Sequence, residues 1–228
     1  MVSVLAVADE VVDSLVLGIG VQGRPDLIVA AGDLPFEYVD GLMATYDVPA
    51  VYVPGNHDPD LRGYRQSRTG WLRAGLPAAD PGPLGALNAD GRTVEAAGLR
   101  ISGLGGSIRY NDGPNQYTEA QQRWRSWRVR VGAHLTRRRP DIVLTHSPAQ
   151  GVGDGDDPAH RGFACFHPLV DDLEPTLLVH GHVHPYGGHP TDKAIGTHTT
   201  SVNVVGYCQF DIDPGHRDFT IVRRRYGA

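Results

Sequence analysis

The sequence predicts an α/β fold with a partly mixed sheet, and three observations support this. Short apolar and β-branched runs recur along the 228 residues and have the length of buried strands. In the first half of the chain, stretches with helical spacing separate these runs, which favours parallel strands joined by helical crossovers. From residue 201 onward the runs follow one another without room for a helix, so we expect the sheet to be only partly parallel.

Eight strands are expected, over residues 2–7, 26–31, 50–53, 99–102, 141–144, 176–179, 201–205 and 219–222. The clearest helix is expected over residues 118–135. There an apolar stripe repeats at intervals of three and four residues, formed by Ala120, Trp124, Trp127, Val131 and Leu135. This spacing places the stripe on one helix face, which we expect to pack against the core. The segments 76–91 and 151–158 are rich in Gly and Pro or in Gly and Asp, and they are expected to be loops.

The length and composition predict a single globular domain over residues 1–228. The chain is 40% hydrophobic and 21% charged, and no apolar run is long enough to cross a bilayer, so no membrane partner is expected. The first apolar run has no basic leader and reaches a carboxylate at Asp9, which is typical of a strand and not of a signal peptide. A cytoplasmic location is the default expectation. The net charge of −5 gives the whole protein no attraction for a polyanion.

Several expected strands end in polar side chains that bind metals. These are Asp9, Asp33, Asn56 with His57, His146, and His182 with His184. Because ligands collect at the carboxyl ends of strands in open α/β sheets, we expect these side chains to converge. Carboxylates, an amide oxygen and imidazoles suit Mn²⁺, Fe or Zn²⁺ better than Ca²⁺. The sequence therefore predicts one or two divalent transition-metal ions as the cofactor. Gly32 and Gly55 allow sharp turns beside this site.

Four strings appear in a fixed order after these strands: Gly32-Asp33, Gly55-Asn56-His57-Asp58, His146 and Gly181-His182-Val183-His184. Together they resemble the calcineurin-like metallophosphoesterases, and their order makes the resemblance specific. The resemblance implies a four-layer α/β/β/α sandwich of two mixed sheets with flanking helices. It also implies a two-metal centre at the strand ends.

The resemblance further implies a role for each site residue. Asp33 would bridge both metals. Asn56, His146 and His182 would complete the shell of one metal, and Asp9 and His184 would hold the other. His57 would be the non-ligand catalytic residue, oriented by a nearby carboxylate, that stabilises charge on the phosphoryl oxygens or protonates the leaving alcohol. Asn56 and His57 would also contact the substrate.

The sequence departs from the family pattern at two places. The first family motif is Asp-x-His, but here it reads Asp9-Glu10-Val11. We therefore expect the metal held by Asp9 to bind more weakly. Glu10 can substitute only if the strand has already ended, because adjacent strand residues point to opposite faces. The arginine that often follows the Gly-Asp motif is also absent, and Arg161 is our candidate for a phosphate contact.

The function predicted is hydrolysis of a phosphodiester or a phosphomonoester by direct attack of a metal-bound hydroxide, without a covalent phospho-enzyme. The expected partner is a small phosphorylated substrate such as a nucleotide, because the chain has no appended recognition module. The alternative is a binding or scaffold protein of this fold that is catalytically weak or inactive, as Val11 would explain. The intact His57 favours catalysis.

Two further patterns suggest other ligands. Seven arginines lie between residues 123 and 139 with Trp124 and Trp127 among them, a combination that single-stranded nucleic acids use. Because both tryptophans lie on the stripe expected to face the core, a structural helix is favoured and nucleic acid is not an expected partner. Residues 18–23 match GxGxxG, but a strand follows instead of a helix, so no nucleotide cofactor is expected there.

Overall fold

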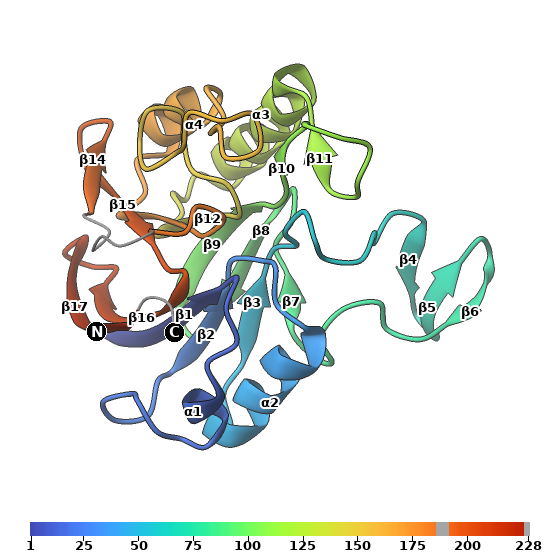
Figure 1. Ribbon diagram of the computed structural model, residues 1–228, viewed down its shortest axis with the longest axis horizontal. Coiled ribbons are helices and arrows are strands. Elements are labelled where there is room, and N and C mark those ends of the chain that lie inside the picture. The colour runs from blue at the N-terminus through green and yellow to red at the C-terminus, as the bar shows by residue number, and fades with distance from the viewer. Residues whose placement is uncertain (186–191, 226–228) are drawn as a thin grey trace.

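The computed structural model describes residues 1–185 and 192–225. Two six-stranded sheets face each other, and helices cover their outer faces (Figure 1). Helices α1 (Asp13–Val16) and α2 (Phe36–Tyr46) pack on one sheet, and α3 (Glu119–Thr136) and α4 (Phe166–Leu173) pack on the other. The expected α/β class with four layers is confirmed.

The first sheet is mixed, with the order β17-β16-β1-β2-β3-β7. Its strands are β17 (Asp218–Arg225), β16 (Gly206–Asp213), β1 (Val2–Ala8), β2 (Leu27–Ala30), β3 (Ala50–Tyr52) and β7 (Leu87–Asn88). Strands β1, β2, β3 and β7 are parallel, and β16 is antiparallel to both β1 and β17. The carboxyl ends of β1, β2 and β3 therefore lie at one edge of the sheet.

The second sheet is also mixed, with the order β14-β15-β13-β12-β9-β8. Its strands are β14 (Lys193–Ile195), β15 (Thr199–Asn203), β13 (Leu177–His180), β12 (Ile142–Thr145), β9 (Leu99–Leu104) and β8 (Thr93–Ala96). The four central strands are parallel, and the outer strands β14 and β8 are antiparallel to their neighbours. A short pair, β10 (Ser107–Ile108) with β11 (Gln116–Tyr117), lies beyond β9.

Alternation along β1 shows how the central strands hold the layers together. Val4 and Ala6 belong to the core between the two sheets, whereas Leu5 and Val7 pack with α1 and α2. Successive strand side chains point to opposite faces, so a strand covered on both faces is apolar throughout. Runs of this kind predicted β1, β2, β3, β9, β12, β13 and β15. The eighth expected strand coincides with β17, an edge strand whose side chains are exposed or partly buried.

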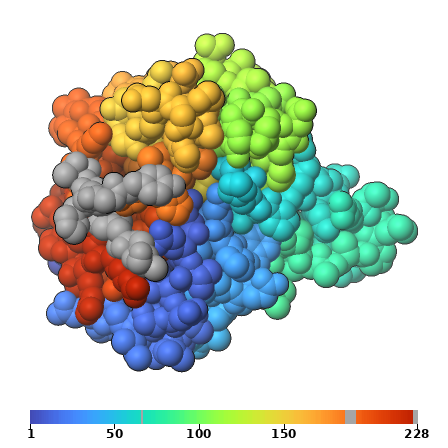
Figure 2. All heavy atoms as spheres, viewed as in Figure 1, coloured from blue at the N-terminus to red at the C-terminus, as the bar shows by residue number. Residues whose placement is uncertain are grey.

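The sequence predicted neither β16, which lies between β1 and β17, nor a small sheet beyond the sandwich. Strands β4 (Tyr64–Ser67), β5 (Gly70–Arg73) and β6 (Leu76–Ala78) form a three-stranded antiparallel sheet that projects from the body (Figures 1 and 2). The expectation of a loop over residues 76–91 is wrong in part, because β6 and β7 lie there. These strands are mostly exposed and have no apolar run, so their pairing leaves little trace in hydrophobicity.

Helix α3 is confirmed, but its orientation reverses our prediction. The N-terminus is fixed by a capping box between Thr118 and Gln121. The stripe expected to face the core is exposed: the exposed fraction is 58% for Trp124 and 81% for Leu135. Trp124 and Trp127 stack on each other, with their ring centroids 4.7 Å apart. The prediction that this stripe packs in the core is wrong, so the argument that favoured a structural role for the tryptophans no longer holds.

The buried face of α3 carries Gln122, Ser126, Val129 and Ala133. It has the same spacing of three and four residues as the exposed stripe, so periodicity alone does not choose between them. Short side chains allow the helix to approach the sheet, and the Gln122 amide donates a hydrogen bond to the carbonyl of Gly105. Among the described helices, none is long and apolar enough to span a membrane.

Candidate metal centre

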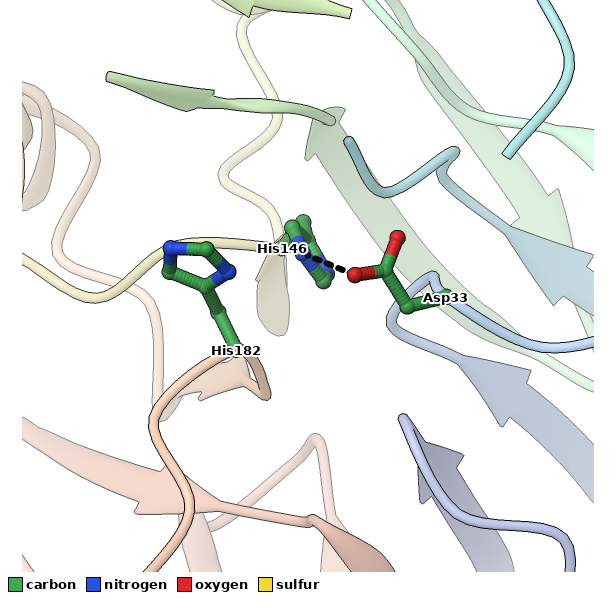
Figure 3. Close-up of side chains that lie close together, drawn as sticks. All are labelled: Asp33, His146 and His182. Atoms are coloured by element: carbon green, nitrogen blue, oxygen red, sulfur yellow. Dashed lines mark ion pairs between the residues drawn. The ribbon is translucent and has the colours of Figure 1, made fainter. Parts of the chain in front are cut away.

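Asp33, His146 and His182 converge from three strand ends (Figure 3). They follow β2, β12 and β13, and their possible ligand atoms all lie within 4.8 Å of one another. Nε2 of His146 is 3.2 Å from a carboxylate oxygen of Asp33. The side chains of His146 and Asp33 are 0% and 9% exposed. Two imidazoles and a carboxylate in such a buried cluster are a set of donors suited to a transition metal.

Asn56 completes this group from the loop after β3. Its Oδ1 lies 3.0 Å from Nε2 of His146, and its amide nitrogen donates a hydrogen bond to the Tyr110 hydroxyl. Because the Asn56 amide nitrogen is bound to Tyr110, its oxygen is directed at His146. The structure therefore brings four of the predicted metal ligands together.

The imidazoles of His146 and His182 are each held by a backbone carbonyl. Nδ1 of His146 lies 2.7 Å from the carbonyl oxygen of Ala31, and Nε2 of His182 lies 2.7 Å from that of Ala159. A nitrogen that donates to a carbonyl leaves the other nitrogen of the ring as the metal donor. The available nitrogens are thus Nε2 of His146 and Nδ1 of His182.

Three predicted site residues have a left-handed backbone. The φ angles are 61° at Asp9, 56° at Asp33 and 69° at His182. Asp9 and His182 each lie at the centre of a three-residue turn, closed by bonds from Glu10 N–H to the Ala8 carbonyl and from Val183 N–H to the Gly181 carbonyl. Such conformations cost on the order of 1–3 kcal/mol each and cluster at functional sites.

The glycines before Asp33 and Asn56 leave room for this geometry. Gly32 has a φ of 94°, and a Cβ there would lie 2.5 Å from the backbone nitrogen of Gly55. A Cβ on Gly55 would overlap the carboxylate of Asp33. The two loops therefore touch backbone to backbone, as only glycine allows.

Asp58 ties these two loops together. Its carboxylate accepts hydrogen bonds from the N–H groups of Asp33 and Gly55, at 3.0 and 2.7 Å. Asn115 adds bonds from its amide to the carbonyls of Gly55 and Asp58. Asp58 thus holds the backbone of the site. Among the hydrogen bonds of the described residues, none joins the Asp58 carboxylate to the His57 imidazole.

The electrostatics of the cluster are those of an anionic site. Burial alone would lower the pKa of His146, but the charges of Asp33 and Asp9 outweigh it and raise this pKa to about 9. Burial and the charge of His146 lower the pKa of His182 to about 3. Burial raises the pKa of Asp9 to about 6. A cation is therefore favoured between these carboxylates, and His146 supplies that charge when it is protonated.

The converging group does not include the other charged and histidine residues predicted for the site. A carboxylate oxygen of Asp9 accepts the His182 N–H at 2.9 Å, while Nδ1 of His184 faces Glu10 at 3.1 Å. The His57 side chain is exposed, and its backbone N–H donates to Asp33 at 2.8 Å. Arg161 is exposed in the loop before α4. Its contact with a phosphate stays a prediction.

Two further residues at this site were not identified from the sequence. Tyr110 contacts Asn56, and the His160 ring lies 5.4 Å from that of His182, with its Nδ1 held at 2.8 Å by Asp157. Neither lies at the end of an apolar run, which was the signal used to find the others. His160 directly precedes Arg161, so this loop lies beside the cluster at His160.

Comparison with known proteins identifies similar folds. The family model described as calcineurin-like phosphoesterase matches residues 8–186. A search of curated proteins finds no match. The crystal structure of TT1561 of Thermus thermophilus superposes with a TM-score of 0.61 at 15% identity, covering 98% of this chain and 99% of that chain. Another solved structure gives a TM-score of 0.64 at 16% identity with the same coverage. At these identities the two structures show the fold alone.

Proposed function

The chain belongs to the calcineurin-like phosphoesterase family, and from this premise we propose that it is a metal-dependent hydrolase of phosphodiesters or phosphomonoesters. One observation carries the proposal: Asp33, His146 and His182 converge from three strand ends in a buried cluster. If the cluster only stabilised the fold, well-packed apolar side chains without backbone strain would serve better. Ligand binding therefore explains the cluster better than a structural role does.

The side chains present fit a divalent transition metal. Asp33, Asn56, His146 and His182 would hold one ion, and Asp9 and His184, with Asp33 shared, would hold a second. The carbonyls of Ala31 and Ala159 already fix which nitrogen of His146 and His182 is available to a metal. Mn²⁺, Fe or Zn²⁺ suits this mixture of nitrogen and oxygen donors.

The metal ions, when bound, would acidify a coordinated water for direct attack on phosphorus and withdraw charge from the phosphate oxygens. The chain's own groups would do the rest. Asn56, oriented by Tyr110, would position a phosphate oxygen. His57, exposed beside Asp33, is free to approach the leaving group and protonate it. His160 is within reach of the same space beside His182 and is a further candidate to contact the substrate.

The substrate class proposed is a small phosphorylated molecule, such as a nucleotide or a cyclic nucleotide, and we favour diesters. The support is indirect: the site lies at the rim of two sheets, and to these the described chain adds only the short pair β10–β11 and the small sheet of β4, β5 and β6. A cytoplasmic location and the absence of a nucleic-acid partner remain expectations from the sequence.

The experiment is hydrolysis of bis-p-nitrophenyl phosphate and p-nitrophenyl phosphate by metal-stripped protein, reloaded separately with Mn²⁺, Fe²⁺ and Zn²⁺. Turnover is expected only after reloading, and the ratio of the two rates gives the preference for diester or monoester. His57→Ala should lower the rate by about 100-fold or more, the scale of general acid catalysis. His198→Ala is the matched control and should behave like the wild type, because His198 is exposed in the turn between β14 and β15.

The alternative of a binding or scaffold protein predicts a different outcome. In that case the protein would bind metal but show no turnover with any ion, and His57→Ala would change nothing. Turnover that is independent of metal would contradict both functions.

A further inference from the structure

Glu10 directly follows Asp9, a predicted ligand, and its side chain contacts His184, another predicted ligand. Its carboxylate oxygen Oε1 is 3.1 Å from Nδ1 of His184. The side chains of Glu10 and His184 are 26% and 33% exposed, so the pair is only partly open to solvent. From this contact we propose that Glu10 is a positioning residue, which holds His184 so that its Nε2 serves as a metal donor. The inference rests on the proposed metal-dependent function.

The backbone explains how consecutive residues can face the same segment. In a strand Asp9 and Glu10 would point to opposite faces. Here β1 ends at Ala8, and Asp9 has a φ of 61° within a turn closed by Glu10 N–H. The turn breaks the alternation. Asp9 can thus bond the N–H of His182 while Glu10 reaches His184.

The segment that carries His184 is also held in place. A Cβ on Gly181 would overlap the carboxylate of Asp9, so this segment packs directly against the end of β1. The carbonyl of Val183 accepts a hydrogen bond from the Asn203 amide at 2.8 Å. His184 therefore starts from a fixed backbone, and Glu10 contacts its ring at Nδ1.

In each of the three proposed ligand histidines, one ring nitrogen is held by an oxygen acceptor. His146 and His182 each bond a backbone carbonyl through the nitrogen remote from the cluster, and His184 bonds Glu10. A carboxylate in this position fixes the tautomer and strengthens the opposite nitrogen as a ligand. Of these three acceptors, the Glu10 carboxylate is the charged one. It would support the site where Val11, 48% exposed, presents no ligand.

The test is calorimetric titration of Mn²⁺ into metal-stripped wild type, Glu10→Ala and Glu10→Gln, with Val11→Ala as the neighbouring control. The wild type should bind two ions. Glu10→Ala should weaken one of them by about 10- to 100-fold, the scale typical of residues that orient metal ligands, and leave the other unchanged. Glu10→Gln keeps an oxygen that accepts from His184, so it should recover most of the affinity. Val11→Ala should match the wild type.

A double-mutant cycle shows whether Glu10 acts through His184. The Glu10→Ala/His184→Ala protein should bind no more weakly than His184→Ala alone, because the ring that Glu10 positions is gone. Equal melting temperatures of all the variants in chelator would show that the fold is intact.

Three results would overturn the inference. Glu10→Ala with unchanged affinity would remove any role. A double mutant that binds the ion more weakly than His184→Ala alone would mean that Glu10 is a direct ligand and does not act through His184. A wild type that binds one ion tightly and no second ion would mean that there is no second site for Glu10 to support. By contrast, a wild type that binds no ion would contradict the proposed function itself.

Discussion

At the scale of single residues, the proposed centre depends on left-handed backbone conformations, which residues other than glycine seldom adopt. Asp9, Asp33 and His182 all have positive φ, and the loops that carry Asp33 and Asn56 are in contact through Gly32 and Gly55. The sequence located these residues because each follows an apolar run. It raised Glu10 only as a possible substitute ligand and gave no signal for Tyr110 or His160, because their approach depends on turns and loops that close only in three dimensions.

Gly55→Ala tests whether this close approach is needed. The new Cβ would overlap the Asp33 carboxylate, so we expect Mn²⁺ affinity to fall by about tenfold or more, although no ligand is removed. Gly132→Ala is the control, because a Cβ there meets nothing within 4 Å and lies on helix α3. Calorimetry should show unchanged binding for this variant. Equal affinities of the two variants would contradict the role given to Gly55.

At the scale of elements, apolar runs identified eight of the strands but not β16, and spacing identified α3 but not the direction in which it faces. The helix has two stripes of equal period, and the larger side chains lie on the outer one. Hydrophobicity favoured the tryptophans, whereas the packing distance to the sheet favours Ser126, Val129 and Ala133. The projecting strands β4, β5 and β6 were missed for a related reason, since they pair without a buried face of their own.

The orientation of α3 predicts an unusual ranking of two substitutions. Leu135→Ala removes more atoms than Val129→Ala, but Leu135 is 81% exposed and Val129 is 3% exposed. Urea denaturation should show a loss of unfolding free energy of about 2 kcal/mol for Val129→Ala and less than about 0.5 kcal/mol for Leu135→Ala. The reverse ranking would restore the orientation expected from the sequence.

Ion pairs at Asp172 also connect helices α3 and α4, so we expect the free energy of unfolding to depend on pH. Asp172 accepts from Arg130 at 2.7 Å and lies 2.9 Å from His134 Nε2, and the bond from Arg130 lowers the pKa of its carboxyl below the ordinary 3.8. The lowered pKa means that this stabilisation is present above the unfolded value and is lost as the pH falls through the folded one.

Asp172→Asn should therefore cost about 0.5 kcal/mol of unfolding free energy at neutral pH, a small value because solvent screens the pair. The difference from the wild type should disappear in acid, below the lowered folded pKa of Asp172, where both proteins have a neutral side chain. Urea denaturation at the two pH values measures it. A cost that is unchanged in acid would show that the charge of Asp172 contributes nothing.

At the scale of the whole molecule, two mixed sheets share one core, and the site lies where their strand ends meet. The four layers were expected only through the family resemblance, because composition and periodicity predict sheets and helices but not how the sheets stack. A single domain over residues 1–228 stays a prediction. It implies that the two sheets unfold together, since separating them exposes the core that both share.

Unfolding in urea should accordingly give one transition, with coincident curves for far-UV circular dichroism and for tryptophan fluorescence. Two separate transitions, one for each sheet, would contradict the single domain. An early change confined to fluorescence would indicate that Trp71 in β5 reports on local opening of the projecting strands.

The central claim is that Asp33, His146 and His182 hold a catalytic metal, and the most direct measurement combines binding and turnover in one sample. Metal-stripped wild type and Asp33→Asn are titrated with Mn²⁺ in a calorimeter, and each sample is then assayed with bis-p-nitrophenyl phosphate. We predict that the wild type binds metal and hydrolyses the diester, and that Asp33→Asn loses both. An Asp33→Asn protein that binds and hydrolyses like the wild type would contradict the account.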